Sequence, residues 1–253
     1  MTDHYIYGIH AVAAVLARRL RPIKKLFVNE DRADKRLKHL LSVASESNTP
    51  IEYLSLQSLN QRFPAFTHQG VVAMVAALPE YVEADLFQLL EMGQAPHLIL
   101  ILDGITDPHN LGACLRSADG AGASFVVIPR DKNAPVTPVV SKVACGAAES
   151  VPIVRVTNLA RAMDVLKQEG IWIYGASGDA EGTLYELDCK SSIAFVLGAE
   201  DKGMRHLTRT QCDGLFALPM LGTVSSLNVS VATGVCLYEA VRQRSFLNKT
   251  PSP

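Results

Sequence analysis

Beyond residue 97 the chain alternates short apolar runs with helical patterns. Five runs are apolar enough to be buried strands: 98–102 (LILIL), 125–129 (FVVIP), 171–176 (IWIYGA), 193–198 (IAFVLG) and 215–219 (LFALP). Continuous apolar runs predict strands that are covered on both faces, and helical stretches between them predict crossovers that keep the strands parallel. The pattern therefore predicts an α/β domain built on a parallel sheet.

Residues 1–78 show a tighter alternation of helical and extended patterns. The predicted order is a helix at 9–18, strands at 24–30 and 51–55 on either side of a helix at 37–47, and a strand at 69–78. So many elements in fewer than 80 residues predict a small, separate α/β sandwich. Residues 79–96 hold four acidic residues and no basic ones between two prolines. We interpret them as a linker with a short helix at 86–90, which leaves 97–247 as the second domain.

Two predicted strands end in polar turns. The strand at 98–102 leads to Asp107, Pro108 and Asn110 and then to a helix that carries Arg116. The strand at 193–198 ends at Gly198 and turns through Glu200 and Gly203, where glycine permits a close backbone approach.

A third polar stretch, 218–234, follows the strand at 215–219. Ser225, Ser226 and Asn228 are strong N-cap types for a helix predicted to carry Val231, Val235 and Leu237 into a core. A well-capped core helix explains this segment taken alone. Because ligands bind in the crevice outside the carboxyl ends of strands in open α/β sheets, the three transitions together predict a binding site.

Composition narrows the class of protein. The chain has 253 residues, of which 48% are hydrophobic, enough for a large core. No apolar run approaches the ~20 residues that span a bilayer, so we expect no membrane segment. The odd number of cysteines, without CxxC or Cys/His spacing, argues against a disulfide framework and a zinc site. The five are Cys114, Cys145, Cys189, Cys212 and Cys236.

The net charge of −1 conceals an asymmetry along the chain. Residues 1–78 hold ten Lys or Arg against six Asp or Glu, whereas the rest holds 14 against 19. Such an excess suits contact with RNA phosphates, although a solvated helix face is the competing interpretation. Nine of the ten lie between residues 18 and 38: Arg18, Arg19, Arg21, Lys24, Lys25, Arg32, Lys35, Arg36 and Lys38.

Nucleotide-binding motifs are incomplete. Gly120, Ala121 and Gly122 begin a GxGxxG pattern, but Phe125 occupies the last glycine position and the pair precedes a strand instead of following one. The dinucleotide fingerprint requires the order strand, turn, helix. The GxxxxGK[ST] pattern is absent from the sequence, so neither NAD nor a nucleoside triphosphate is expected.

The three polar transitions resemble the three signature motifs of the SPOUT-class RNA ribose 2′-O-methyltransferases of the TrmH type. The resemblance runs from Leu98 to Tyr238 with the motifs in the family's order. The amino-acid sequences of 143–152 (VACGAAESVP) and 224–234 (VSSLNVSVATG) are most similar to those of family members that methylate a guanosine of 23S ribosomal RNA. YGIHAV at 7–12 and HQGVVA at 68–73 resemble the ribosomal-protein-like RNA-binding domain that precedes the methyltransferase domain in this branch.

The resemblance implies a fold, a cofactor and partners. It implies that residues 97–247 form a SPOUT domain with a deep trefoil knot, that the protein is a cytoplasmic homodimer, and that it uses no metal. It also implies S-adenosylmethionine as cofactor, bound by Gly198, Leu218 and Leu227. We expect Gly198 to allow close approach to the cofactor and the two leucines to wall the adenine; ordinary core packing is the alternative for both leucines.

The resemblance further implies the catalytic residues Asn110, Arg116, Glu200, Ser226, Asn228 and Ser230. A guanidinium hardly ever loses a proton, so we expect Arg116 to hold a phosphate and stabilise the 2′-alkoxide. Glu200 is expected to orient Arg116 or a ribose hydroxyl, and Ser230 to bond a carbonyl one turn back. The alternative is that Arg116 is an ordinary surface arginine and Glu200 an ordinary exposed glutamate in a turn.

Two function classes remain open at the level of sequence. The favoured one is a 23S ribosomal RNA (guanosine-2′-O-)-methyltransferase, with a transfer RNA ribose 2′-O-methyltransferase as the enzymatic alternative. Relatives of the latter kind carry basic terminal extensions, whereas this chain has the ribosomal-protein-like leading domain. The second class is a non-catalytic RNA-binding protein of the same fold, which the intact motif set disfavours.

Overall fold

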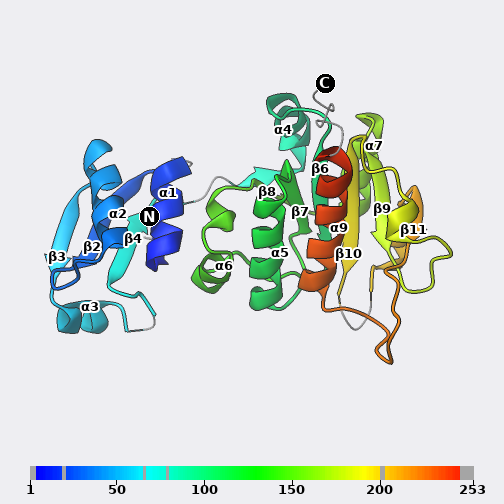
Figure 1. The fold of residues 1–253 in the computed structure, drawn as a ribbon. Helices are drawn as coiled ribbons and strands as arrows, with labels where there is room; N and C mark the ends of the chain where they lie inside the picture. Colours follow the sequence, from blue (N-terminus) through cyan, green and yellow to red (C-terminus); the bar gives the residue numbers. More distant parts are fainter. Residues whose placement is uncertain (1–3, 19–20, 65–66, 78–79, 200–202, 246–253) are drawn as a thin grey trace, which may run out of the picture. The chain divides into compact units, whose positions relative to one another are not determined.

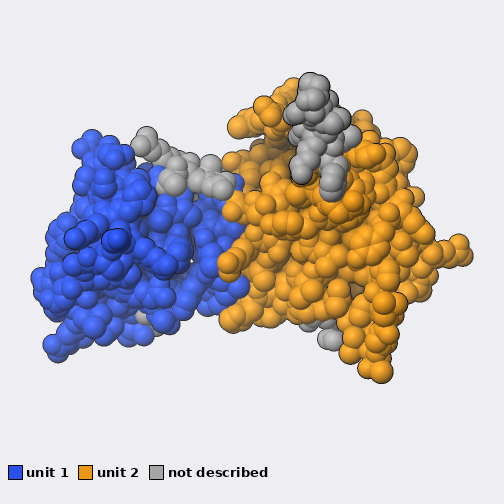
Figure 2. Space-filling model, in the orientation of Figure 1, with its two compact units in different colours: residues 1–79, 136–150 blue, residues 80–135, 151–253 orange. Residues whose placement is uncertain are grey.

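The computed structural model describes residues 4–18, 21–64, 67–77, 80–199 and 203–245. The chain divides into two compact units, shown in different colours in Figure 2. Unit 1 comprises residues 1–79 and 136–150, and unit 2 comprises residues 80–135 and 151–253. Unit 1 therefore takes in a segment from the middle of the chain as well as the N-terminal residues.

Unit 1 is a four-stranded sheet with helices on both faces. Its strands lie in the order β1-β4-β2-β3; β4 is antiparallel to β1 and β2, and β3 is parallel to β2. The elements are β1 (His4–Tyr7), α1 (Ile9–Arg18), β2 (Ile23–Asn29), α2 (Lys35–Glu46), β3 (Ile51–Leu54), α3 (Leu56–Arg62), β4 (Val71–Val75), α6 (Pro138–Val143) and the 3-10 turn η2 (Ala147–Glu149).

Alternation along β2 separates the two faces of this sheet. Leu26 and Val28 pack with residues of α1 and α2, whereas Phe27 packs on the other face with Phe63 and Leu59. The predicted helices and strands of this unit are all present. The sequence pattern missed β1, α3 and α6, which have four, seven and six residues.

Residues 136–150 are tied to the N-terminal part of unit 1 by a buried ion pair. Arg21 Nε donates to Glu149 Oε2 at 2.7 Å and Nη2 to Oε1 at 2.5 Å, while Nη1 donates to the carbonyl oxygen of Ala76 at 3.0 Å. Burial raises the pKa of the Glu149 carboxyl, and the charge of Arg21 opposes that rise. The expectation that Arg21 contacts phosphates is therefore wrong, since its guanidinium is buried inside the fold.

Unit 2 is built on a parallel sheet of seven strands within the described residues. Their order is β11-β9-β10-β6-β7-β8-β5, and every neighbouring pair is parallel. The strands are β5 (Tyr81–Val82), β6 (Leu98–Asp103), β7 (Phe125–Pro129), β8 (Ile153–Val156), β9 (Trp172–Ala176), β10 (Ile193–Gly198) and β11 (Gly214–Phe216). The predicted parallel α/β architecture is confirmed.

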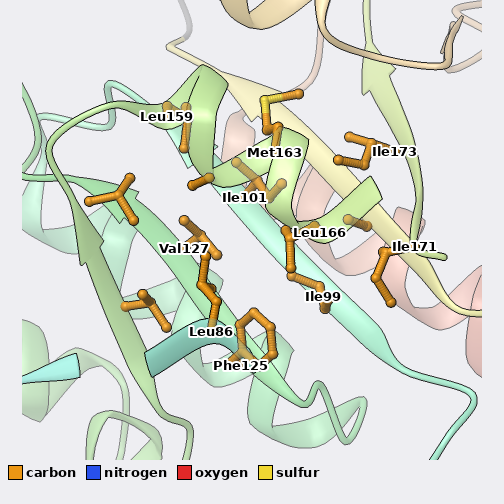
Figure 3. Packing of buried hydrophobic residues seen from close by; sticks show 14 of the residues in the cluster. Leu86, Ile99, Ile101, Phe125, Val127, Leu159, Met163, Leu166, Ile171 and Ile173 are labelled. Carbon is orange, nitrogen blue, oxygen red and sulfur yellow. The ribbon is translucent and has the colours of Figure 1, made fainter. Parts of the chain in front are cut away.

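Helices cover both faces of this sheet (Figure 1). One face carries α5 and α9, which lie side by side, and the other carries α7. Figure 3 shows Leu159, Met163 and Leu166 of α7 packed over Ile99 and Ile101 of β6. The helical segments are α4 (Leu86–Met92), α5 (Pro108–Gly120), α7 (Leu159–Gln168), α8 (His206–Thr210), α9 (Val229–Ser245) and the 3-10 turns η1 (Glu83–Asp85) and η3 (Leu184–Glu186).

The acidic stretch after residue 79 contributes to unit 2. Its predicted short helix is present as α4, whose Leu86, Leu89 and Leu90 join the core cluster that α7 covers. Tyr81 and Val82 form β5, which pairs with β8 at the edge of the sheet. The sequence pattern missed the edge strand β5 and its neighbour β8, because β5 has two residues and β8 includes Arg155 among its four.

The burial of α9 differs from the sequence prediction at two positions. Leu237 is fully buried as expected, but Val231 is 52% exposed, so the prediction that Val231 enters the core is wrong, and Val235 is only partly buried. The buried face instead runs through Val229, Ala232 and Cys236. The five cysteines are free thiols, three of them buried, and burial raises the pKa of Cys189 to about 11 and that of Cys212 to about 12.

Candidate active site

A cavity of about 400 Å³ lies at the carboxyl ends of β9, β10 and β11. Three loops converge on it because these strands are parallel neighbours, and their carboxyl ends meet at one edge of the sheet. The cavity contains the three predicted cofactor residues, Gly198, Leu218 and Leu227, and also Ser226. Its remaining described lining residues are Ala176, Ser177, Gly178, Leu197, Ala199, Gly203, Met204, Arg209, Met220, Ser225, Val229 and Ala232.

Gly198 is required by a backbone crossing within the protein. A Cβ at this position would lie 2.1 Å from the carbonyl carbon of Gly203 and 2.2 Å from the nitrogen of Met204. Gly203 N donates to Ala199 O at 2.8 Å, which closes the turn tightly against β10. The sequence prediction assigned this close approach to a ligand, whereas the structure assigns it to the turn. Glu200, the remaining predicted residue of this turn, lies outside the described residues.

Gly178 presents bare backbone to the cavity. A Cβ added there would meet nothing within 4 Å, so the space beside it is open. Sequence reasoning missed this loop, because the motif search stopped at the strands that precede polar helix caps. The run SGDAEG at 177–182, after the strand at 171–176, was the available signal, since glycine and short polar residues at a strand end typify a ligand loop.

Arg209 of α8 is bound to this loop through three hydrogen bonds. Its Nη1 donates to Ser177 Oγ at 2.6 Å and to Asp179 Oδ1 at 3.0 Å, and its Nη2 donates to Asp179 Oδ2 at 3.0 Å. Ser177 Oγ in turn donates to Asp179 Oδ1 at 2.5 Å. Hydrogen bonds from Arg209 and Ser177 lower the pKa of the Asp179 carboxyl to about 2, so it is ionised at neutral pH.

The N-terminus of α8 is anchored to the end of β6. Arg205 immediately precedes α8, and its backbone nitrogen donates to Asp103 Oδ2 at 2.8 Å. Its Nε donates to Asp103 Oδ1 at 2.6 Å, and the Asp103 side chain is fully buried. The helix that carries Arg209 is therefore fixed to the central part of the sheet.

A second cluster joins the first and third predicted motifs. Asn228 Nδ2 donates to Asn110 Oδ1 at 3.1 Å, which links α5 to the start of α9. Asn228 Oδ1 accepts from Ser230 N at 2.9 Å and from Ser230 Oγ at 2.5 Å. Asn228 thus caps α9 as expected, whereas the prediction that Ser230 bonds a carbonyl one turn back is wrong. Thr233 makes that kind of bond, from Oγ1 to Val229 O at 2.8 Å.

Arg116 lies on the exposed surface of α5. It follows Asn110 by under two turns of a helix that Asp107 caps, through Asp107 Oδ1 accepting from His109 N at 2.9 Å. Arg116 is not among the residues that line the cavity. Its guanidinium makes no hydrogen bond or ion pair with the side chains that the structure describes, so it can meet a ligand from solvent.

The side chains of the basic stretch of unit 1 differ in their exposure. Arg21 is buried, Lys25 pairs with Glu52 at 2.7 Å, and Arg32 pairs with Asp34. Lys24, Lys35, Arg36 and Lys38 are exposed, the last three on α2. The side chains of Arg18 and Arg19 lie outside the described part of the chain.

No helix in the described residues is long and apolar enough to cross a membrane. No group of three or more His, Cys, Asp or Glu side chains in the described ranges has the arrangement of a metal site.

Comparison with protein-family models matches nearly the whole chain. Residues 97–238 match the SpoU rRNA Methylase family. Residues 5–81 match the family described as RNA 2′-O ribose methyltransferase substrate binding.

Two relatives illustrate the sequence similarity. The 23S rRNA (guanosine-2′-O-)-methyltransferase RlmB of Pseudomonas putida is 52% identical over 239 residues, which cover 94% of this chain and 96% of that protein. The protein of the same name from Escherichia coli K12 is 52% identical over 240 residues, 95% of this chain and 98% of its own length.

Solved structures agree with these matches. The SpoU methyltransferase AviRb from Streptomyces viridochromogenes, crystallised in complex with the cofactor AdoMet, superposes with a TM-score of 0.81 at 26% identity, covering 96% of this chain and 91% of AviRb. The TrmH/SpoU tRNA modifying enzyme of A. aeolicus has a TM-score of 0.56 at 29% identity and covers 65% of this chain and 85% of its own.

Proposed function

The chain belongs to the SpoU rRNA methylase family, and from this membership we propose that it transfers a methyl group from S-adenosylmethionine to the ribose 2′-hydroxyl of a guanosine in 23S ribosomal RNA. The observation that carries the proposal is the 52% identity to two enzymes of that name over 94% and 95% of this chain. Because the match covers both units, the substrate assignment extends to unit 1 as well as to the catalytic domain.

The cavity of unit 2 fits S-adenosylmethionine. A flat adenine, a ribose and a cationic sulfonium need apolar walls and backbone hydrogen-bonding groups more than basic side chains. Leu197, Leu218 and Leu227 supply apolar surface, and Gly178 and Gly198 expose backbone. Among the described lining residues Arg209 alone is charged, and Asp179 pairs with it. When bound, the cofactor supplies a methyl group activated by the sulfonium charge.

The acceptor side is assigned to α5 and the start of α9. A ribose hydroxyl becomes nucleophilic as its proton leaves, so the site must stabilise developing negative charge. Arg116 is exposed and always cationic, which suits it to hold the adjacent phosphate and stabilise the 2′-oxygen. The bond between Asn228 and Asn110 fixes the two amide side chains relative to each other, so that they can orient the ribose.

Unit 1 is proposed to bind RNA through residues 1–78. The substrate-binding family model covers residues 5–81, and exposed lysines and arginines of α2 provide positive charge for phosphates. Unit 1 would then set which RNA is held, while unit 2 carries out the transfer.

We also propose that the protein is a homodimer and that its chain forms a trefoil knot. Val231 and Tyr238 are each 52% exposed and stand two turns apart on one side of α9. Such an apolar stripe favours a second copy of this chain as its cover.

Insertion of β10 between β9 and β6 favours a path in which residues from 195 onward pass through earlier chain as a trefoil knot. An enzyme that acts on ribosomal RNA is expected in the cytoplasm.

A transfer RNA acceptor is the enzymatic alternative. The tRNA modifying enzyme of A. aeolicus covers 65% of this chain, so it has no counterpart for about a third of it. AviRb, in contrast, covers 96%. The full-length match to the 23S enzymes favours ribosomal RNA.

Ribose methylation should be mapped in ribosomal and transfer RNA from cells that have or lack this chain. We expect one guanosine of 23S ribosomal RNA to lose its 2′-O-methyl group in cells that lack it. Loss confined to transfer RNA would establish the alternative acceptor, and an unchanged map would favour a protein that only binds RNA.

A further inference from the structure

We propose that Arg209 is a positioning residue of the cofactor pocket, which it serves by holding Ser177, Gly178 and Asp179 as one wall. We further propose that Asp179 cancels the positive charge that Arg209 would otherwise present to the sulfonium. Both statements rest on the proposed function, since they take S-adenosylmethionine as the ligand.

The first step is the geometry of the wall. β9 ends at Ala176, and Ser177, Gly178 and Asp179 follow it in the loop. Backbone bonds hold the two ends of the loop: Ser177 N donates to Phe216 O at 2.9 Å, and Ala217 N donates to Gly182 O at 2.8 Å. Between these ends, Arg209 grips the side chains on both sides of Gly178. Gly178 itself has no side chain with which to fix its position.

The second step is the geometry of the hydrogen bonds that Arg209 makes with Ser177 and Asp179. The guanidinium engages both carboxylate oxygens of Asp179 through separate nitrogens, the planar fork that arginine offers and lysine does not. The Ser177 hydroxyl accepts from Arg209 and donates to Asp179, so its proton and one lone pair are committed. A wall that is already ordered costs the ligand less to bind.

The third step is the anchor of Arg209. The residue lies in α8, and Arg205 ties the start of that helix to the buried carboxylate of Asp103. The brace therefore runs from β6 through α8 to the loop after β9. The brace joins β6, the strand of the first predicted motif, to the loop after β9, which belongs to none of the three predicted motifs.

The fourth step is electrostatic. Arg209 lines the cavity, and an unpaired guanidinium there would repel a sulfonium cation. Asp179 is ionised at neutral pH, so the pair is neutral as a whole. S-adenosylmethionine carries the sulfonium charge and its demethylated product does not. The ratio of the two dissociation constants therefore reports the charge of the wall.

The test measures both dissociation constants by calorimetry on the full-length protein. Asp179→Asn and Arg209→Gln should each weaken S-adenosylmethionine binding about fivefold, the effect of one well-formed ion pair. Asp179→Asn leaves a bare cation, so the ratio of the dissociation constant for S-adenosylmethionine to that for the product should rise roughly threefold. Arg209→Gln leaves a bare anion, so that ratio should fall by a similar factor.

Two further variants separate bracing from general damage. Arg209→Lys keeps the charge but loses the fork, so affinity should weaken while the ratio stays at the wild-type value. Arg161→Gln removes a comparable pair, in which Arg161 donates to both oxygens of Glu83 away from the cavity, and it should change neither quantity. Asp179 is 70% exposed, so Asp179→Asn should keep the wild-type unfolding temperature.

The proposal is overturned if Asp179→Asn and Arg209→Gln bind both compounds as the wild type does. If the affinities of both variants weaken with an unchanged ratio, the statement that Asp179 cancels the charge of Arg209 is overturned, and the brace alone stands. Failure of the wild-type protein to bind either compound would instead refute the proposed function, so the two failures are distinguishable.

Discussion

At the scale of single residues, the glycines of the pocket do different work. Gly178 borders open space, whereas a side chain on Gly198 would collide with the backbone of Gly203. The first glycine therefore leaves room for a ligand, and the second permits the chain to fold over itself. Sequence alone does not separate these roles, because both positions simply appear as glycine at a strand end.

Alanine substitutions should have different effects at the two glycines. Gly178→Ala places a methyl group in the cofactor's space and should weaken S-adenosylmethionine binding about tenfold with an unchanged unfolding temperature. Gly198→Ala should lower the unfolding temperature, because backbone must move to admit the methyl group. Calorimetry and thermal unfolding are the measurements. Wild-type affinity in Gly178→Ala would place the cofactor elsewhere.

Substitution of Arg116 should reduce the rate of methyl transfer without reducing cofactor affinity. If it stabilises the developing 2′-alkoxide, Arg116→Ala should lose on the order of 100-fold in the single-turnover rate on saturating RNA, with cofactor affinity retained. Arg116→Lys should rescue only in part, since a point charge cannot hold two oxygens in a planar fork. A near-wild-type rate for the alanine variant would shift the role to Asn110 and Asn228.

Residue roles were predictable where a motif fixed them and unpredictable where the fold decided. The sequence brought Gly198, Leu218 and Leu227 together correctly in one cavity. It placed Arg21 on the surface, because the partner that buries it, Glu149, is 128 residues away. A composition argument counts charges and cannot see such a pairing.

At the scale of elements, the crossover segment 136–150 completes unit 1. A Cβ on Gly146 would lie 2.3 Å from the Cβ of Ala14, so this turn packs directly on α1. The ion pair of Arg21 and Glu149 lies in the same place and is almost entirely buried. We infer that unit 1 depends on this segment for stability.

Removing one partner of the pair should expose that dependence. Arg21→Met leaves the buried Glu149 carboxylate unpaired and should lower the free energy of unfolding by about 3–5 kcal/mol at neutral pH. Burial already raises the pKa of Glu149, and loss of Arg21 should raise it further. Stability from such a carboxyl is present below its unfolded-state pKa and is lost as pH rises through its folded-state pKa.

The deficit of Arg21→Met relative to wild type should therefore grow as pH rises through the folded-state pKa that Glu149 has in the wild type. Denaturant titrations at acidic and neutral pH measure it. The double variant Arg21→Met/Glu149→Leu is the control and should recover most of the loss, because the buried charge is gone. A deficit independent of pH would contradict the account.

Elements were predicted in proportion to their length and apolarity. The five long apolar runs of unit 2 all became strands, whereas β5 and β8 were missed because they are short or carry a charge. For α9 the prediction of core residues was right at Leu237, wrong at Val231 and only partly met at Val235. A helix covered on two sides, by the sheet and by α5, gives a weak periodic signal.

At the scale of the whole molecule, the account divides RNA binding from methyl transfer. Exposed basic residues of α2 are assigned to phosphates, and the pocket of unit 2 is assigned to the cofactor. Lys35→Ala/Arg36→Ala/Lys38→Ala should weaken RNA binding and flatten its salt slope by roughly 0.9 per lost phosphate contact. Cofactor affinity should not change. An unaltered slope would mean that these side chains only face solvent.

The central claim is tested most directly by reconstitution from purified parts. The wild-type protein would be incubated with 23S ribosomal RNA that lacks the modification and with S-adenosylmethionine carrying an isotope-labelled methyl group, and the RNA would be mapped by mass spectrometry. The account predicts label on the ribose 2′-oxygen of one guanosine, at most one methyl group per RNA. Label on a base, label on transfer RNA in a competing mixture, or no label with folded protein would contradict it.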